Sequence, residues 1–316
     1  MTDPGMKCSR CQAPARHRFP AHNARFCDPC LERFIERQVE RAIKQFAMLE
    51  PGQKVLVAVS GGKDSLTAWQ VLRRLGYAAE GVHVSLELGA GEFSAASLAA
   101  CAEMAGRLQA PLHVFRMADL TGLTVEEVAR ANRRSFCSVC GTLKRYYLNK
   151  LALDLGFPVL ATGHHLDDEA GRLLGNLIHR HHEFLENQWP ALEGAPGGFA
   201  KKIKPLCRLA GREIKAYAKV HGLPVASGHC PRAKGATLPY YQEAMQLLED
   251  RMPGTTRILY LGFLEEKDGP PPLPDVQAVC SVCGAPTWAE VCTTCRFLQR
   301  AREQKQARAN EASAAG

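Results

Sequence analysis

A run of apolar residues ends abruptly in a short polar segment that could bind an anion. Residues 55–59 read Val-Leu-Val-Ala-Val, and an amphipathic stretch follows at 66–75. A strand that turns into the start of a helix presents unpaired backbone N–H groups, and adjacent glycines let a phosphate approach the backbone. The segment is not a Walker A loop, because Val57 stands where that motif requires glycine. The candidate phosphate-binding residues are Ser60, Gly61, Gly62, Lys63, Asp64 and Ser65.

Eight of the thirteen cysteines form two sets of paired Cys-x-x-Cys motifs, one set near each end of the chain. Two such pairs supply four thiolates to one zinc ion, and segments this short cannot bury a core of their own. We therefore predict two structural zinc sites without a catalytic role, in preference to disulfides or reactive dithiols. The predicted ligands are Cys8, Cys11, Cys27 and Cys30 in the first unit, and Cys280, Cys283, Cys292 and Cys295 in the second.

Five further cysteines lie between these units. Cys137 and Cys140 form a pair just before a predicted basic helix, and Cys230 stands far from them in sequence. Three thiolates suit a [4Fe–4S] cluster whose fourth iron has no protein ligand and can bind an exogenous sulfide. A third zinc ion and a redox dithiol are equally compatible with the spacing. Cys101 lies in an apolar helical pattern, which predicts a core position, and Cys207 is predicted to be structural or close to the site.

Hydrophobic periodicity predicts the elements that must position these residues. We expect strands at 55–59, 81–88, 112–117 and 159–162, and helices at 33–49, 66–75, 95–108, 125–134, 143–155, 167–179, 211–221 and 239–251. This alternation is typical of a parallel sheet covered on both faces, which binds ligands at the carboxyl ends of its strands. We further expect an irregular insert at 182–199, a break at 269–274, and a tail from 302 that is either a frayed helix or disordered.

Composition and charge suggest a polyanionic partner. The chain has 316 residues, is 46% hydrophobic and carries a formal charge of +8. Basic residues dominate the stretches 130–150, 201–219 and 296–308, which favours nucleic acid as a partner over simple solvation of helix faces. Residues 1–10 contain no apolar signal-peptide region, and no apolar run approaches membrane-spanning length. We therefore expect a soluble, cytoplasmic protein with no membrane association.

In combination, these motifs resemble a known family. Residues 60–65 resemble the pyrophosphate loop, or PP-loop, of enzymes that cleave ATP between the α- and β-phosphates. With both terminal cysteine units, Cys137-x-x-Cys140, the segment Thr-Gly-His-His-Leu-Asp-Asp-Glu at 162–169 and Cys230-Pro231, the chain resembles the tRNA 2-thiouridine synthetases of the TtuA type. The resemblance covers residues 8 to about 297. The related TtcA enzymes, which thiolate a tRNA cytidine, share the loop and a three-cysteine cluster but lack the terminal zinc units.

The resemblance implies a specific architecture. It predicts an α/β adenine nucleotide α-hydrolase-like domain over 35–268, an N-terminal zinc finger in 1–34, a C-terminal zinc ribbon in 278–298 and a tail at 302–316. It also raises the [4Fe–4S] cluster on Cys137, Cys140 and Cys230 above the alternatives. The resemblance assigns catalytic roles to Lys144 and Asp168, with Asp167 as the alternative. Gly163 and His164 are candidate nucleotide-binding residues, and His165 could also line the nucleotide pocket. From the residues alone, Lys144 is as readily a solvated helix lysine and Asp167 a helix N-cap.

The implied reaction uses ATP and Mg²⁺ to adenylate the C2 oxygen of a tRNA uridine, which sulfide on the open iron then replaces. The expected partners are tRNA, a sulfur-carrier protein such as a thiocarboxylated ubiquitin-like protein, and a second copy in a homodimer. Residues 179–199 depart from the family pattern, so the target nucleoside stays open. The alternatives are cytidine 2-thiolation, sulfur insertion into a small molecule, and a non-catalytic nucleic-acid-binding zinc protein.

Overall fold

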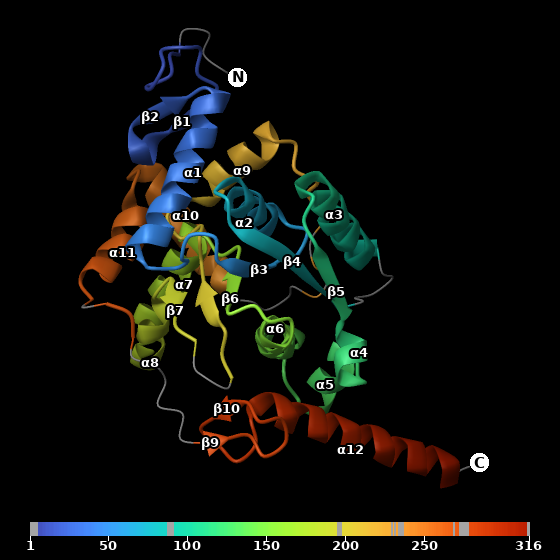
Figure 1. The fold of residues 1–316 in the computed structure, drawn as a ribbon. Helices are drawn as coiled ribbons and strands as arrows, with labels where there is room; N and C mark the ends of the chain where they lie inside the picture. Colours follow the sequence, from blue (N-terminus) through green and yellow to red (C-terminus); the bar gives the residue numbers. More distant parts are fainter. Residues whose placement is uncertain are drawn as a thin grey trace.

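A six-stranded, mostly parallel sheet forms the centre of the computed structural model, with strand order β5-β4-β3-β6-β8-β7 (Figure 1). The structure describes residues 6–86, 92–194, 198–228, 230, 232, 237–267, 269–271 and 278–314. Only β7, at the edge, runs antiparallel to its neighbour within this sheet. The strands are β3 (Lys54–Ala58), β4 (Ala78–Ser85), β5 (Leu112–Arg116), β6 (Val159–Thr162), β7 (Ala191–Leu192) and β8 (Lys201–Ile203).

Alternate residues of the central strands face two separate cores. In β3, Val55 and Val57 pack into one core while Leu56 packs into the other, and in β6 Leu160 faces away from Val159. Because successive side chains of a strand point to opposite faces, a strand that is buried on both faces must be apolar throughout. The residues of β3 are therefore apolar without interruption because helices cover both faces of the sheet.

Helices cover both faces of the sheet (Figure 1). One core receives α1 (Asp28–Gln45), α2 (Lys63–Arg74), α3 (Glu92–Leu108), α7 (Leu166–Ile178), α9 (Gly211–Val220) and α11 (Thr255–Glu265). The other receives α4 (Met117–Thr121), α5 (Val125–Ala131), α6 (Phe136–Asp154) and α12 (Thr293–Ala314). The helix α10 (Leu238–Arg251) packs against α7. No helix in the described part of the chain combines the length and the hydropathy that a membrane span requires.

The two terminal cysteine units share one design. Each has a short antiparallel hairpin followed by a long helix, β1 (His17–Phe19) and β2 (Ala24–Phe26) before α1, and β9 (Ala278–Val279) and β10 (Pro286–Thr287) before α12. In each unit the second cysteine pair straddles the start of that helix. The helix α1 continues through the predicted boundary at 34, so it ties the N-terminal unit to the central domain.

Several elements differ from the sequence-based expectations. The helix α6 begins at Phe136 rather than at 143, because Ser135 caps it by accepting from the backbone N–H of Ser138. Residues 182–199 are not wholly irregular, since they include α8 (His182–Leu185), a 3-10 turn (Glu186–Gln188) and β7. Of the two alternatives for the tail from 302, the structure shows the helix, because α12 continues as far as Ala314, and Figure 1 shows this helix extending from the body. Residues 87 and 88, expected to end the second strand, lie outside the described residues.

A buried ion network joins α7 to the loop after β8. The carboxylate of Glu169 is fully buried and accepts from Lys204 Nζ at 2.6 Å and from Arg172 Nη1 at 2.9 Å. Burial alone would raise the pKa of Glu169, but the two cations outweigh it and lower that pKa. The carboxylate therefore stays ionised inside the core and holds α7 against the sheet.

We expect Glu169→Gln to lower the free energy of unfolding by about 3–5 kcal/mol, because it leaves Lys204 buried without its counter-ion. The folded-state pKa of Glu169 lies below its ordinary value of 4.5. The stabilisation should therefore be complete above that pH and be lost as the pH falls through the folded-state pKa. Urea unfolding of wild type and variant across this acidic range measures the effect. A difference under about 1 kcal/mol at neutral pH would contradict this role.

Candidate active site

The loop between β3 and α2 has the geometry of an anion-binding turn. Gly62 is the N-cap of α2, and no side chain caps its exposed N–H groups. Inside the turn, Ser65 Oγ donates to the carbonyl of Gly62 at 3.1 Å and accepts from the backbone N–H of Ser60, also at 3.1 Å. This serine pair fixes the turn, and the helix dipole adds partial positive charge where a phosphate would sit.

Gly61 is required at its position for two reasons. Its φ is +75°, and a Cβ there would lie 2.7 Å from the carbonyl oxygen of Ser97 on α3. Its own carbonyl accepts from the backbone N–H of Ala226 at 2.9 Å, which anchors the segment that leads to Cys230. Gly163 packs as closely from the other side, since a Cβ there would lie 2.6 Å from the backbone nitrogen of Ser65.

We expect Gly61→Ala to reduce ATP-dependent AMP formation at least about 100-fold, because the turn must shift away from α3. The left-handed backbone and the clash should also destabilise the fold by about 1–2 kcal/mol or more. Gly62→Ala is the matched control for stability, since φ is ordinary there and its nearest neighbour, Ser60 Oγ, lies 3.5 Å from the added Cβ. Equal unfolding midpoints for the two variants would contradict the argument.

A cavity of about 300 Å³ opens beside this loop at the carboxyl ends of β3 and β4. Its walls come from the loop, the ends of both strands, α3, α6 and the segment 226–230. Its polar and sulfur-bearing lining includes Ser60, Gly62, His83, Ser97, Lys144, Cys140 and Cys230. The candidate phosphate loop, the candidate catalytic lysine and two candidate cluster ligands therefore share one cavity.

The third candidate ligand, Cys137, lies next to this cavity. Its Sγ donates to the carbonyl of Arg232 at 3.2 Å, two residues beyond Cys230. The thiolates of a single tetrahedral ion all lie close to one another. Among the described residues, the thiols of Cys137, Cys140 and Cys230 do not form a group whose sulfur atoms all lie within 4.8 Å of one another. Burial raises the pKa of Cys140, nearby Cys230 and Cys137 add to the rise, and Lys144 opposes it. Three separated thiols beside a cation suit a multi-iron cluster better than one zinc ion.

His83 is a cavity residue that the sequence reasoning missed. Its Nδ1–H donates to the carbonyl of Val59 at 2.9 Å, and burial, reinforced by Lys144, lowers its pKa. The imidazole is therefore neutral at neutral pH, with its proton fixed on Nδ1. A histidine within the apolar run of β4 was the only signal in the sequence, and it did not show which face the ring would take.

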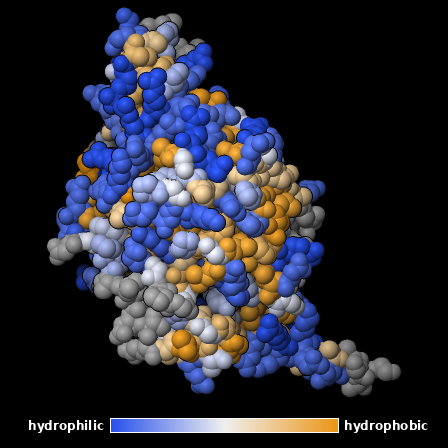
Figure 2. Space-filling view, in the orientation of Figure 1, coloured by the Kyte–Doolittle hydropathy of each residue, from blue (hydrophilic) through white to orange (hydrophobic). Residues whose placement is uncertain are grey.

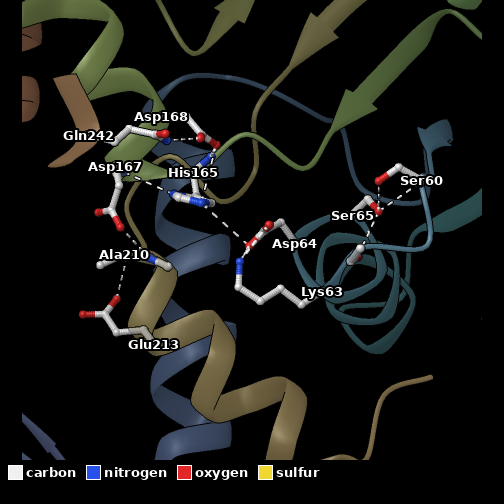
Figure 3. A network of polar contacts seen from close by, with 12 residues as sticks. Ser60, Lys63, Asp64, Ser65, His165, Asp167, Asp168, Ala210, Glu213 and Gln242 are labelled. Atoms are coloured by element: carbon white, nitrogen blue, oxygen red, sulfur yellow. Dashed lines mark hydrogen bonds and ion pairs between the residues drawn. The ribbon is translucent and has the colours of Figure 1, made fainter. Parts of the chain in front are cut away.

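A second polar network lies on the other side of Lys63, at the start of α7 (Figure 3). Lys63 Nζ contacts both carboxylate oxygens of Asp64, at 2.7 and 2.9 Å. His165 Nδ1 accepts from the backbone N–H of Asp167 at 3.2 Å, so its proton lies on Nε2. That nitrogen lies 3.7 Å from Asp64 Oδ1 and 3.6 Å from Asp168 Oδ2. His165 thus links the acidic residue of the loop to the predicted catalytic carboxylate.

The two neighbouring aspartates differ in what they contact. Asp168 Oδ2 accepts from the backbone N–H of His165 at 3.0 Å and closes a capping box, while Oδ1 accepts from Gln242 at 2.8 Å. Asp167 Oδ2 accepts from the backbone N–H of Gly211 at 3.0 Å, and burial raises the pKa of Asp167. Asp167 and Lys63 line a separate cavity of about 340 Å³. His165, rather than the expected Asp167, is the N-cap of α7.

The remaining predicted residues are also located. His164 shares a hydrogen bond of 2.9 Å with Thr162 Oγ1, and burial lowers its pKa. Cys101 and Cys207 are fully buried, and burial raises the pKa of each thiol to about 12. The Sγ of Cys101 lies 3.6 Å from His83 Nδ1, next to the cavity. Both are core thiols, and neither is positioned as a reactive thiolate.

Each terminal unit brings four thiols together. In both sets all four sulfur atoms lie within 4.8 Å of one another, with Cys11 and Cys27 at 3.5 Å and Cys283 and Cys292 at 3.8 Å. Burial alone would raise the pKa of the Cys8 and Cys280 thiols. Hydrogen bonds from backbone N–H groups outweigh burial and lower the pKa of each to about 6. The donor sets therefore fit tetrahedral zinc, which binds thiolates.

Comparison with known proteins agrees with this geometry. A family model described as a PP-loop domain matches residues 34–227. The tRNA-5-methyluridine(54) 2-sulfurtransferase of Thermotoga maritima is 37% identical over 301 residues, 95% of this chain and 98% of the relative. That of Thermus thermophilus is 40% identical over 306 residues, 95% and 94% of the two chains. The solved structure of U34-tRNA thiolase NcsA from Methanococcus maripaludis with its [4Fe–4S] cluster has a TM-score of 0.79 at 23% identity, covering 93% of this chain and 96% of that one.

The fold and the loop thus define a PP-loop protein with an ATP-binding α/β domain. Within that class, the chain belongs to the family of tRNA 2-thiolation sulfurtransferases of the TtuA type. The expected fold class and family are both confirmed.

Proposed function

We propose that this protein replaces the C2 oxygen of a tRNA uridine with sulfur, after ATP has adenylated that oxygen. The observation that carries the proposal is the shared cavity, where the loop residues Ser60 and Gly62 face Lys144, Cys140 and Cys230. A carbonyl oxygen is a poor leaving group. When it attacks the α-phosphate of ATP, pyrophosphate leaves, and the oxygen can later depart from the carbon as part of AMP. Adenylation of the C2 oxygen and attack of sulfide on the C2 carbon involve the two ends of one C–O bond. The ATP site and the sulfur site must therefore lie next to each other.

The loop residues would bind the phosphates. Backbone N–H groups at the start of α2 and the hydroxyls of Ser60 and Ser65 would hold the departing pyrophosphate as charge develops on it. Lys144, on the opposite wall, would neutralise negative charge around the α-phosphate. Asp168, or its neighbour Asp167, would act with Asp64 to orient Mg²⁺. The carboxylates of Asp64 and Asp168 both lie near His165 Nε2, beside Lys63.

Cys137, Cys140 and Cys230 would hold a [4Fe–4S] cluster at the mouth of the cavity. Such a cluster has one iron without a protein ligand, which supplies a position for the incoming sulfur. The three thiols come from two segments, and the Gly61–Ala226 hydrogen bond fixes one of those segments to the phosphate loop. That bond couples the placement of Cys230 to the placement of the nucleotide.

The substrate and partners follow from the relatives. Relatives at 37–40% identity are named for 5-methyluridine 54, so we propose that position as the target rather than cytidine or a small molecule. The basic stretches would bind the tRNA backbone, and each terminal unit would bind one Zn²⁺. A sulfur-carrier protein would supply sulfur to a cytoplasmic enzyme that acts as a homodimer. We keep the domain limits of 1–34, 35–268 and 278–298 as units of this proposal.

The direct experiment is anaerobic incubation of the reconstituted protein with ATP, Mg²⁺, sulfide and tRNA that carries 5-methyluridine at position 54 but no 2-thio group. We expect AMP and a 2-thiolated uridine to form in equal amounts, with both absent when tRNA is omitted. Mass spectrometry of the digested tRNA identifies the nucleoside and its position. Formation of ADP, or AMP without thiolated tRNA, would contradict the proposal, and a non-catalytic nucleic-acid-binding protein would give neither product.

A further inference from the structure

A second large cleft lies between α6 and the C-terminal cysteine unit. It has a volume of about 520 Å³, within the range that accommodates a small ligand or a nucleotide. The helix α6 forms a wall of both sites, since Cys140 and Lys144 line the cavity described above while Arg145 and Tyr146 line this cleft. The proposed catalytic steps do not use this cleft, although Cys283 and Cys292 of the predicted zinc site line part of it.

The cleft is preformed rather than a loose gap. Asn149 Nδ2 donates to the carbonyl of Gly198 at 2.8 Å, and Asn149 Oδ1 accepts from the backbone N–H of Ala200 at 3.1 Å. Gly198 lies so close to Pro286 that an added Cβ would meet its ring at 1.9 Å. These contacts fix the floor of the cleft against both α6 and the C-terminal unit.

Two cations in the cleft have no acidic partner among the residues that the structure describes. Among the described residues, no carboxylate makes an ion pair with Arg145 or Lys202, whereas Asp154, which also lines the cleft, pairs with Lys150 at 3.0 Å. Burial lowers the pKa of Lys202, and the nearby Arg145 lowers it further. Two neighbouring, partly desolvated cations repel each other until an anion lies between them. This arrangement favours a phosphate group.

Aromatic side chains supply the other half of a nucleotide site. Trp288 and Phe199 line the cleft together with Tyr146. The Trp288 side chain is 70% exposed, an unusual fraction for tryptophan, whereas Trp69 and Trp189 are buried. Lys202 Nζ lies 5.5 Å from the centre of the Phe199 ring. Around the C-terminal cysteine unit, at the bottom of the view, Figure 2 shows apolar and polar side chains interspersed.

We propose that this cleft binds one unpaired nucleotide of the tRNA other than the one being modified, with its base stacked on Trp288 and its phosphate between Arg145 and Lys202. The inference rests on the proposed function, because it takes tRNA to be the substrate. Stacking on aromatic rings and contact with cations is the general mode by which proteins hold unpaired bases. The shared helix α6 would then position the tRNA relative to the cavity that carries Lys144.

The first test uses tryptophan fluorescence. Titration of the full-length protein with unmodified tRNA should change the emission, and Trp288→Phe should remove most of that change while the phenylalanine ring still permits binding. The other two tryptophans are buried and provide the internal control. A change of the same size in Trp288→Phe would overturn the proposal. Inorganic phosphate alone should leave the emission nearly unchanged, and a full response to it would identify an anion site without base stacking.

The second test uses affinity for the same tRNA. Trp288→Ala should raise the Kd about 5- to 150-fold, as expected for loss of one base stack. Arg145→Gln with Lys202→Gln should raise it at least about tenfold and reduce the salt dependence of binding by about one phosphate contact. Lys44→Gln with Lys54→Gln removes the same charge from exposed lysines away from the cleft and is the matched control. Zinc content and thermal unfolding show that each variant is folded.

The outcomes separate the two proposals. Wild-type affinity in both cleft variants, with normal thiolation, would overturn the cleft assignment and leave the proposed function intact. Failure of the wild-type protein to bind or thiolate tRNA would overturn both. Equal weakening by the control pair would show that net charge, rather than this cleft, determines the affinity.

Discussion

Replacing Cys137, Cys140 or Cys230 with alanine should each abolish the broad visible absorbance that anaerobic reconstitution with iron and sulfide gives to the wild-type protein. Thiolation of tRNA should be lost in parallel. The physical reason is that a cluster held by three thiolates loses its anchorage when one is removed. Apart from Cys140 and Cys230, no described cysteine lines the cavity to replace the lost ligand. Iron content per chain and absorbance measure the first effect, and nucleoside analysis measures the second.

Cys207→Ala is the matched control for these variants. Its thiol is fully buried in the core and has a pKa raised to about 12, so its loss should leave a small cavity and cost about 1 kcal/mol without changing the iron content. Zinc should stay bound in all four variants, because the two terminal cysteine sets are separate. Unchanged iron content in the three cavity variants would refute the assignment.

Lys144→Met should reduce the rate of thiolation about 100- to 1,000-fold, with the cluster absorbance unchanged. Lys144 lines the same cavity as the phosphate loop and Cys140, where the proposed reaction would develop negative charge as pyrophosphate leaves. The methionine side chain keeps most of the apolar length of lysine but removes the charge. Single-turnover measurement of AMP formation isolates the adenylation step.

Lys54→Met provides the comparison for Lys144. Lys54 is exposed at the amino end of β3, whereas the cavity lies at the carboxyl ends of the strands. Its loss should therefore change the rate less than about twofold. If Lys144→Met retained wild-type AMP formation, Lys144 would be only a solvated helix lysine. If the variant lost its cluster absorbance, the defect would be in the cluster site rather than in phosphate charge neutralisation.

The sequence predicted the central strands and the phosphate loop, because the patterns that indicate them lie within short stretches of the chain. The run at 55–59 reads as a strand buried on both faces, and the next six residues read as a turn that ends at the start of a helix. The strand at 159–162 and the start of the helix at Leu166 also lie within one residue of expectation. Short spacing also identified the two four-cysteine groups, because one metal ion requires its ligands to come from tight turns.

What the sequence did not predict depends on contacts between distant segments. The strand β8 has three residues, too few for periodicity to register, and it is defined by pairing with β6. The buried pair Glu169–Lys204 joins residues 35 positions apart, and Asp168 bonds Gln242 across 74 positions. The sequence left a frayed helix and disorder as alternatives for the tail from 302, and the contacts of α12 with α5, such as the ion pair of Lys305 with Glu127 at 3.2 Å, favour the helix.

The measurement that bears most directly on the account follows one oxygen atom. If ATP activates the uridine, tRNA carrying ¹⁸O at C2 of the target uridine should transfer that label to the phosphate of AMP, one label for each thiolated nucleoside. Mass spectrometry of the AMP released in a single turnover gives the answer. Unlabelled AMP formed together with thiolated tRNA would contradict adenylation of the C2 oxygen, and with it the proposed reason for placing the three thiols beside the phosphate loop.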